Sequence, residues 1–187
     1  MKISKKFKPG QVIGSFKVDG KKVVFRTIKL SDLEGCMSYI NWLIAKKAYI
    51  SLQNKVSRKS EAKWIKGKVK ELKEGNKIAV VIEVDGKVGG LVEVWRWPLA
   101  NKHVSEIGIG VGPYRRIGLG TKALELMEKI AKKNFKSKIM VIKYMEPNKI
   151  AEGLYKKRGF KETGKIPKGI KHYGKYIDEI ILYKELR

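Results

Sequence analysis

The segment "YRRIGLGT", residues 114–121, places two arginines and two glycines just ahead of an amphipathic run. The residues that can do chemistry there are Arg115, Arg116, Gly118 and Gly120. Their spacing predicts a loop that leads into a helix. The first turn of a helix offers free N–H groups and the positive end of the helix dipole, and guanidinium groups bind phosphate in a forked geometry. The segment therefore predicts an anion site, most directly a site for phosphate.

Two nucleotide-binding motifs are alternatives for this loop. A Walker A loop needs Gly-Lys-Ser/Thr after its glycines, and "GLGTK" does not have that order. Gly118-x-Gly120-x-x-Ala123 fits the dinucleotide fingerprint GxGxxA. That fingerprint follows its strand almost at once and opens the first βαβ unit of a chain, whereas here a Pro-Tyr-Arg-Arg spacer and two hairpins come first. Dinucleotide binding is therefore the weaker interpretation.

The strand expected before the loop has glycines at alternate positions. In "EIGIGV", Ile107, Ile109 and Val111 share one face, and Gly108 and Gly110 share the other. Because glycine weakens a strand, the pattern indicates that something approaches the backbone closely. A ligand would do so, and the alternatives are a bulge or a helix packed tightly on the sheet.

These residues resemble a known family. Arg115-x-x-Gly118-x-Gly120 is similar to the Q/R-x-x-G-x-G/A signature of the GNAT superfamily of N-acetyltransferases, and Arg116 stands where many relatives have glycine. Downstream, "NKIAEGLYKKRGF" resembles the second motif of that family, and the resemblance covers roughly residues 21–186. The matching positions of this second motif are Asn148, Ala151, Leu154, Tyr155, Lys157, Gly159 and Phe160.

The resemblance implies acetyl-CoA as cofactor, coenzyme A as product and no metal. It implies that pantetheine lies along the splayed middle strand like an additional strand, with its pyrophosphate on the loop of residues 115–121. The implied cofactor-binding residues are Ile109, Gly110, Val111, Arg115, Arg116, Ile117, Gly118, Leu119, Gly120, Thr121, Asn148, Ala151, Tyr155 and Lys157.

Acetyl transfer to a primary amine needs a base for the acceptor, a donor for the thioester oxygen and an acid for the departing thiolate. A backbone N–H of the splayed strand is the simplest donor. Tyr155 matches the position of the usual acid in this family, and a phenol with a pKa of about 10 suits an alkyl thiolate. The alternative is a tyrosine that packs its helix against the sheet.

The base is predicted to be Glu106, acting directly or through water, because it shares a face with the two glycines of the strand. The alternative for Glu106 is an ion pair with a nearby lysine. His103 is the second candidate, since histidine exchanges protons near neutral pH, although it also fits a surface loop. His172 is expected in a late loop, where it borders the acceptor pocket or is an exposed turn residue.

The charge is unusual: 43 Lys and Arg residues against 18 Asp and Glu residues give a formal net charge of +25. That excess favours an anionic partner, such as nucleic acid, an acidic membrane surface or a polyphosphorylated small molecule. It is also typical of composition at high temperature, because the lysines are spread along the chain and glutamine is rare. If the charge reaches the acceptor mouth, it favours acidic acceptors.

A second function remains open on these grounds. It is a basic nucleic-acid- or ribosome-associated protein on a GNAT fold with little or no transferase activity. Only "KWIKGKVK" combines an aromatic residue with a basic stretch in its favour, and no nucleic-acid motif supports it. The acceptor amine of the transferase hypothesis is equally open: a protein N-terminus, a lysine side chain or a small molecule. The protein is expected to be a monomer or a homodimer.

The length and composition of the chain limit the kinds of protein that it can be. The 187 residues, 43% of them hydrophobic, predict a single globular domain over residues 1–187, with residues 1–20 as an N-terminal extension or added strand. No apolar run approaches the length of a membrane span, and the start "MKISKKFKPG" leads into no signal region, so a cytoplasmic protein is expected. Cys36 is the single cysteine, which excludes an internal disulfide and a CxxC metal site.

The fold class expected is α/β (α+β): a GNAT-type mixed, mostly antiparallel sheet of about seven strands with splayed middle strands and about four helices. The tetrapeptide "VDGK" at 18–21 and again at 84–87 predicts two tight hairpins. The strands are expected near 11–18, 21–28, 78–84, 87–96, 103–111, 138–144, 160–166 and 175–184. The helices are expected over about 33–44, 58–74, 118–134 and 148–159.

The first helix is expected to begin with a capping box formed by Ser31 and Glu34. Its inward face is then expected to consist of Leu33, Met37, Ile40 and Ile44. In the third helix the inward residues are expected to be Leu124, Met127, Ile130 and Ala131.

Overall fold

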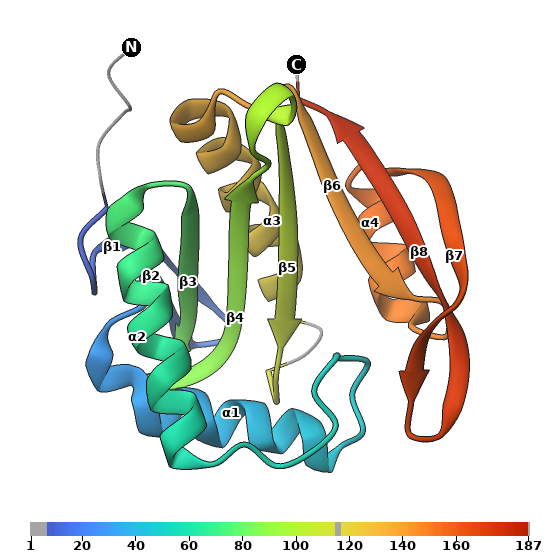
Figure 1. Cartoon of the computed structure of the whole chain (residues 1–187). Coiled ribbons are helices and arrows are strands. Elements are labelled where there is room, and N and C mark those ends of the chain that lie inside the picture. Colours follow the sequence, from blue (N-terminus) through green and yellow to red (C-terminus); the bar gives the residue numbers. More distant parts are fainter. Residues whose placement is uncertain (1–6, 115–116, 187) are drawn as a thin grey trace.

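A computed structural model describes residues 7–114 and 117–186, and its backbone forms one eight-stranded sheet in the order β1-β2-β3-β4-β5-β6-β8-β7 (Figure 1). Neighbouring strands are antiparallel except β5 and β6, which are parallel. The expected mixed, mostly antiparallel sheet is confirmed, and β1 lies at one edge of it. The strands are β1 (Val12–Val18), β2 (Lys21–Thr27), β3 (Lys77–Val84), β4 (Lys87–Arg96), β5 (Val104–Val111), β6 (Ile139–Met145), β7 (Lys161–His172) and β8 (Lys175–Glu185).

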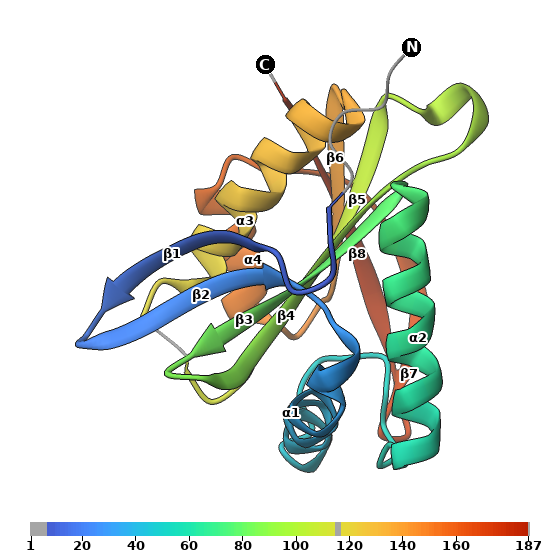
Figure 2. The ribbon, with the colours of Figure 1, turned by 90° about the vertical axis from the view of Figure 1, so that its left-hand side faces the viewer.

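Helices cover both faces of the sheet (Figure 2). The α-helices of the described residues are α1 (Leu33–Ala45), α2 (Arg58–Glu74), α3 (Leu119–Ile130) and α4 (Lys149–Lys157). Helices α1 and α2 lie on one face, and α3 and α4 lie on the other. A π-helical turn, Ala131–Phe135, extends α3.

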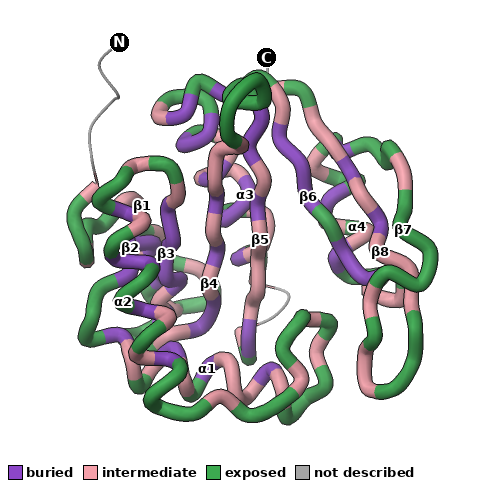
Figure 3. The backbone as a smooth tube through the Cα atoms, viewed as in Figure 1, coloured by how far each residue is buried: buried purple, intermediate pink, exposed green. Residues whose placement is uncertain are grey.

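The strand β3 is almost wholly apolar because both of its faces are covered. Ala79 and Val81 pack in the cluster below α1 and α2, whereas Val80 and Ile82 pack in the larger cluster on the side of α3. Figure 3 shows the resulting buried centre in the sheet, and the mostly exposed β7 at its edge. The inward face predicted for α3 is confirmed, since Leu124, Met127, Ile130 and Ala131 are all buried.

Both "VDGK" segments form the predicted hairpin turns. Asp19 and Gly20 have φ angles of 49° and 73°, and Asp85 and Gly86 have φ angles of 47° and 79°. Two consecutive positive φ angles give the tight turn whose twist matches antiparallel strands. These turns fix the registers of β1 on β2 and of β3 on β4.

The predicted cap of α1 is wrong. A 3-10 turn, Leu30–Asp32, precedes the helix, and Asp32 rather than Ser31 is the N-cap residue. The Asp32 carboxylate accepts a hydrogen bond of 2.9 Å from the Lys29 N–H. Arg26 donates two further bonds to the same carboxylate, at 2.8 and 2.9 Å. The Asp32 carboxylate is thus bonded to a buried arginine, and the helix starts one residue later than a capping box on Ser31 would require.

The inward face of α1 also differs from the prediction. Its buried residues are Cys36, Tyr39 and Leu43, a face rotated from the stripe of Leu33, Met37, Ile40 and Ile44. A search for aliphatic residues at helical spacing misses this face, because Cys36 carries a thiol and Tyr39 a phenol. Cys36 is 3% exposed, and burial raises the pKa of its thiol to about 12, so it packs as a small apolar group.

Candidate active site

Strands β5 and β6 pair over only part of their length. The pairing joins Val104–Ile107 to Ile139–Ile142, and beyond it the two strands diverge (Figure 1). On its other side β5 stays paired with β4 as far as Val111. Residues 108–111 therefore have a neighbouring strand on one side and an opening on the other.

Two hydrogen bonds establish which backbone groups of β5 face this opening. The Gly112 N–H donates to the Gly89 carbonyl at 2.8 Å, and the Trp97 N–H donates to the Val104 carbonyl at 3.0 Å. Even-numbered residues of β5 therefore turn their polar backbone groups toward β4. Because these groups alternate along a strand, the N–H and C=O groups of Ile109 and Val111 point the other way. We call these groups the open edge of β5; an extended ligand can pair with them as a further strand does.

The glycines in and just after β5 are not all required for the same reason. A Cβ atom on Gly110 would collide with the Tyr39 hydroxyl of α1, and one on Gly112 would lie 3.1 Å from the Tyr39 ring. A Cβ atom on Gly108 would have its nearest neighbour at 3.7 Å, in the Trp95 ring, which is an ordinary contact. The tightly packed helix, one of the alternatives for this pattern, is therefore what requires glycine at position 110.

The loop after β5 ends at the N-terminus of α3. Gly118 is the N-cap with φ 78°, and the Lys122 N–H donates to its carbonyl at 3.1 Å, which closes the first turn. The N–H groups of Leu119, Gly120 and Thr121 come before that bond, so the helix itself provides no acceptors for them. These amides form the helix half of the predicted phosphate site. Arg115 and Arg116, predicted for its other half, lie outside the described residues.

A pocket of about 360 Å³ lies where β5 and β6 diverge. Its walls come from α1 and the loop that follows it, from β4 and β5, and from β6 and α4. Four of the predicted cofactor-binding residues line it: Ile109, Gly110, Asn148 and Tyr155. The other lining residues are Tyr39, Ile40, Leu43, Tyr49, Ile50, Ser51, Leu52, Leu91, Glu93, Gly108, Lys143 and Tyr144.

Other predicted cofactor-binding residues lie around the pocket without lining it. Val111 ends the open edge, and Ile117 and Thr121 are half-buried beside the α3 N-terminus. Ala151 is buried on α4, where its N–H donates to the capping Asn148 side chain at 3.2 Å. Lys157 is exposed near the end of α4.

Tyr155 reaches the pocket from α4. It is 4% exposed, and its ring lies edge-on to Tyr144 at 6.0 Å and against Phe160 at 6.2 Å. Burial raises the pKa of the Tyr155 phenol, which therefore holds its proton at neutral pH. The site thus contains a protonated hydroxyl group as a possible proton donor, and the same ring packs α4 on the sheet.

Glu106 does not line the pocket directly. Its carboxylate accepts a 3.0 Å hydrogen bond from the Trp97 indole and lies 3.8 Å from the Lys143 ammonium group. Lys143 does line the pocket, so Glu106 lies one side chain behind its wall. The ion pair with a lysine, the alternative for this residue, is present.

A second carboxylate, Glu93 on β4, lines the pocket and was missed from the sequence. It faces the same side of the sheet as Gly108, which is its partner across the strands. Its oxygens lie 3.0 Å from the Lys68 ammonium group and 3.9 Å from that of Lys77. The sequence does contain a sign of this position: Glu93 is an acidic residue on the strand face that Gly89, Leu91 and Trp95 share, in a strand whose central residues are otherwise apolar.

The two histidines lie at opposite ends of the sheet. His103 is exposed just before β5, and its carbonyl accepts bonds from Lys138 and Ile139. Six residues of strand separate it from Ile109, about 20 Å at 3.3 Å per residue, which places it away from the pocket. His172 ends β7 and is half-buried rather than an exposed turn residue: its Nε2 bonds to the Ala48 carbonyl at 3.1 Å, and its ring stacks on Tyr49.

The family follows from comparison with known proteins. A model of the acetyltransferase (GNAT) family matches residues 38–160. The chain belongs to this family. It is also 33% identical, over 116 residues, to an N-alpha-acetyltransferase of Sulfurisphaera tokodaii. That alignment covers 56% of this chain and 66% of the relative, just under two thirds of its length.

Solved GNAT structures share the fold. The ribosomal L7/L12 alpha-N-protein acetyltransferase RimL, in complex with coenzyme A, has a TM-score of 0.82 at 14% identity over 94% of this chain and 98% of that one. The ribosomal-protein-S5-alanine acetyltransferase of Vibrio fischeri has a TM-score of 0.80 at 18% identity over 92% and 96%.

The described residues contain neither a cluster of metal-binding side chains nor a helix that could span a membrane. No group of three or more His, Cys, Asp or Glu side chains is arranged there to hold a metal ion. Within the same ranges, no helix combines the length and the apolar composition that crossing a bilayer requires.

The junction of α3 and α4 gives a test of the cofactor site in this GNAT protein. A Cβ atom on Gly120 would lie 2.8 Å from the Leu154 Cδ2 atom, so Gly120→Ala requires the Leu154 side chain or the α3 N-terminus to shift. We expect Gly120→Ala to weaken coenzyme A binding by about tenfold, the effect of losing one or two hydrogen bonds. Calorimetry measures it, and Gly120→Ala/Leu154→Ala should recover most of the loss. No recovery would show that the α3–α4 spacing does not set the affinity.

Proposed function

We propose that this protein is an acetyl-CoA-dependent N-acetyltransferase whose acceptor is the α-amino group of a polypeptide. The observation that carries the proposal is the open edge of β5, together with the first amides of α3, for which the helix itself provides no acceptors. Membership of the GNAT family supports the activity, and the name of the Sulfurisphaera tokodaii relative supports the α-amine. Neither comparison favours a binding protein without activity.

The residues present fit acetyl-CoA. The open edge offers the N–H and C=O groups of Ile109 and Val111, which match the amides of a pantetheine arm. The amides of Leu119, Gly120 and Thr121 match a pyrophosphate, and Arg115 and Arg116 are proposed to add their guanidinium charge. Bound acetyl-CoA supplies the activated acetyl group as a thioester.

Tyr155 is proposed as the acid. Its phenol lines the pocket and is proposed to deliver its proton from Oη to the sulfur that leaves, although burial raises the pKa of this phenol and so makes it a weaker acid. The proton returns to Tyr155 from solvent after each turnover. A backbone N–H of the open edge is proposed to stabilise the thioester oxygen as it gains charge.

Glu106 is proposed as the base and acts through a water molecule, because Lys143 stands between its carboxylate and the pocket. The Trp97 indole bonds to Oε2, and Oε1, which lies 3.8 Å from the Lys143 ammonium group, is the oxygen proposed to accept a bond from that water. Glu93 is the alternative, since it lines the pocket, but Lys68 and Lys77 both hold its charge. Either carboxylate must be ionised to accept the proton of the acceptor ammonium group.

Glu106→Gln tests this assignment. The amide keeps an acceptor for Trp97 but cannot take a proton, so we expect kcat/KM to fall by about 10²-fold, the low end for a general base. The rise of kcat/KM with pH should move to higher pH, because the amine then has to lose its proton to solvent. Glu93→Gln is the matched variant. If Glu93→Gln loses the activity and Glu106→Gln keeps it, the role belongs to Glu93.

The function itself is tested in two steps. Calorimetry with coenzyme A reports binding, and acetyl-pantetheine, which lacks the pyrophosphate, should bind far more weakly if the α3 N-terminus is the phosphate site. Release of free thiol from acetyl-CoA is then followed with peptides, with the same peptides blocked at the α-amine, and with lysine and polyamines. Turnover only with free α-amines is expected. Turnover of lysine or polyamines alone would keep the transferase and change the acceptor, and no coenzyme A binding at millimolar concentration would end the proposal.

A further inference from the structure

Two segments that are remote in sequence meet beside the pocket: one of them lines it, and the other packs against the first. The loop after α1, residues 46–57, contributes Tyr49, Ile50, Ser51 and Leu52 to the lining. The tip of the β7–β8 hairpin, residues 166–177, lies against that loop. The Tyr173 N–H donates to the Gln53 side chain at 2.8 Å across 120 residues of sequence, and the Tyr173 hydroxyl donates to the Ile44 carbonyl at 3.0 Å.

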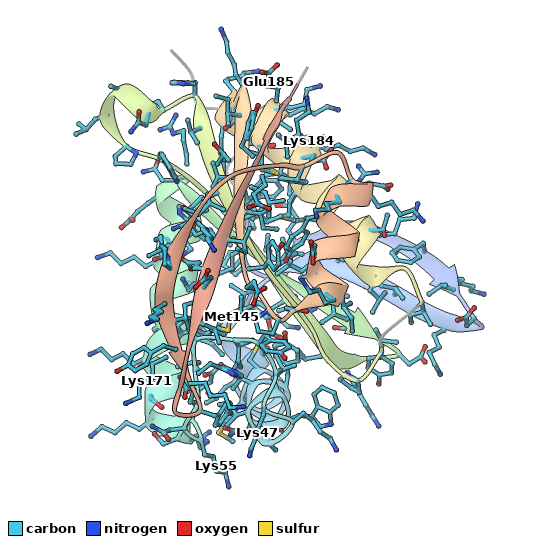
Figure 4. The ribbon with its side chains drawn as sticks, turned by 90° about the vertical axis from the view of Figure 1, so that its right-hand side faces the viewer. Lys47, Lys55, Met145, Lys171, Lys184 and Glu185 are labelled. Carbon is cyan, nitrogen blue, oxygen red and sulfur yellow. The ribbon has the colours of Figure 1, made fainter. Side chains whose placement is uncertain are left out.

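The outer surface of these two segments is strongly basic. It carries six exposed lysines, which we call the lysine collar: Lys46, Lys47, Lys55, Lys168, Lys171 and Lys175. Neither segment contains an aspartate or a glutamate. Figure 4 shows Lys47, Lys55 and Lys171 gathered at one end of the molecule. Asp178, which follows the hairpin tip, is already paired with Lys165 at 2.8 Å.

The interior of the pocket differs in charge from its rim. Most of its lining is aromatic or aliphatic, and each of its two charged residues has a partner of opposite sign. Glu93 lies 3.0 Å from Lys68, and Lys143 lies 3.8 Å from Glu106. The pocket interior therefore has no unpaired charge on its lining side chains, whereas the segments that include and pack against residues 49–52 of that lining carry six exposed lysines.

We propose that the acceptor is the N-terminus of an acidic polypeptide segment: its first residue enters the neutral interior, and carboxylates at the following positions lie on the lysine collar. This proposal rests on the transferase function proposed above and names its substrate class. A chain of several residues is required because none of the six collar lysines lines the pocket itself, so the collar lies beyond the first residue of the acceptor. A phosphate backbone carries the same charge but offers no primary amine to acetylate.

The first test compares two peptides that differ only in charge, with glutamates at positions 2 to 5 in one and glutamines in the other. Each exposed ion pair is worth a factor of about 1.4 to 5, so two or three pairs predict a kcat/KM about tenfold higher for the glutamate peptide at low salt. The advantage should shrink toward unity at about 1 M salt, where the screening length falls to about 3 Å.

The second test changes the collar. Lys47→Gln/Lys55→Gln/Lys171→Gln should remove most of the preference for the glutamate peptide and leave turnover of the glutamine peptide unchanged. The control, Lys129→Gln/Lys133→Gln/Lys138→Gln, removes the same charge from exposed positions at the other end of the sheet and should keep the preference. Lys47 and Lys171 also lie over the Tyr173 and Tyr176 rings, so Lys47→Arg/Lys55→Arg/Lys171→Arg is the rescue that keeps both charge and ring contacts.

The outcomes separate this inference from the function on which it rests. A preference that disappears in the collar variant, stays in the control and returns in the arginine variant supports it. Equal rates for the two peptides, or an equal loss in both glutamine variants, overturns it while thiol release still establishes a transferase. Turnover of lysine or polyamines without peptides also overturns it, and no coenzyme A binding overturns both.

Discussion

Tyr155→Phe is expected to lower kcat by about 10²- to 10⁴-fold, the range that a positioned general acid contributes. Coenzyme A affinity should stay within about twofold, because the ring keeps its contacts with Tyr144 and Phe160 and only the hydroxyl group is lost. The thermal midpoint should hardly move for the same reason. Single-turnover release of thiol, with calorimetry on the same preparation, measures the two effects separately.

Tyr144→Phe is the matched control, because it removes a second phenol from the same pocket. It should keep at least about half of the activity. Equal losses in both variants would mean that the pocket needs polar surface rather than one acid. Full activity of Tyr155→Phe would show that Tyr155 is not the acid. The residue would then only pack α4 against the sheet, which is the alternative given in the sequence analysis.

Arg26→Met is expected to cost about 3–5 kcal/mol of unfolding free energy, the penalty for breaking a buried ion pair from one side. The Arg26 guanidinium group bonds twice to Asp32 and once, at 2.9 Å, to Glu83, and Arg26 and Asp32 are 8% and 4% exposed. Methionine fills much of the volume but leaves the Asp32 charge buried without its partner. Since Asp32 immediately precedes α1, its loss of the Arg26 bonds also weakens the attachment of the start of this helix to β2. Urea denaturation measures the loss.

Arg58→Met is the comparison for this stability prediction. Arg58 bonds to Glu34 at 2.7 Å, a good distance, but the two side chains are 71% and 62% exposed. Its loss should therefore cost less than about 1 kcal/mol. Similar costs for both variants would contradict the claim that burial, rather than bond length, decides the value of the Arg26 cluster.

The sequence predicts best where one short segment decides the structure. The "VDGK" turns and the apolar stripe of α3 are local, and both are confirmed. The face of α1 is not local, because Tyr39 is buried by a contact with Gly110 on a strand about seventy residues away. The length of β7 was underestimated for a similar reason: its exposed residues have little apolar pattern, and pairing with β8 extends it to His172.

The candidate site divides in the same way. The α3 N-terminus and Tyr155 belong to segments that a motif describes; Tyr155 lines the pocket, and the roles of both stay predictions. Glu93 comes from a strand that carries no motif, and the partners that hold its charge, Lys68 and Lys77, come from α2 and β3. The lysine collar is similarly invisible along the chain, since its two halves meet only through the folding of the hairpin onto the α1 loop.

The short pairing between β5 and β6 has a consequence for the whole molecule. Among the described strands, four paired residues of β5 and β6 link β1–β5 to β6–β8 within the sheet. The sheet therefore has two parts, and the junction between them, which we call the seam, is paired over only part of its length. A ligand that bridges the seam adds cohesion to the folded state alone, and its binding energy raises resistance to heat and proteases. If coenzyme A is that ligand, as proposed above, the resistance of this protein to heat and proteases should rise with the concentration of coenzyme A.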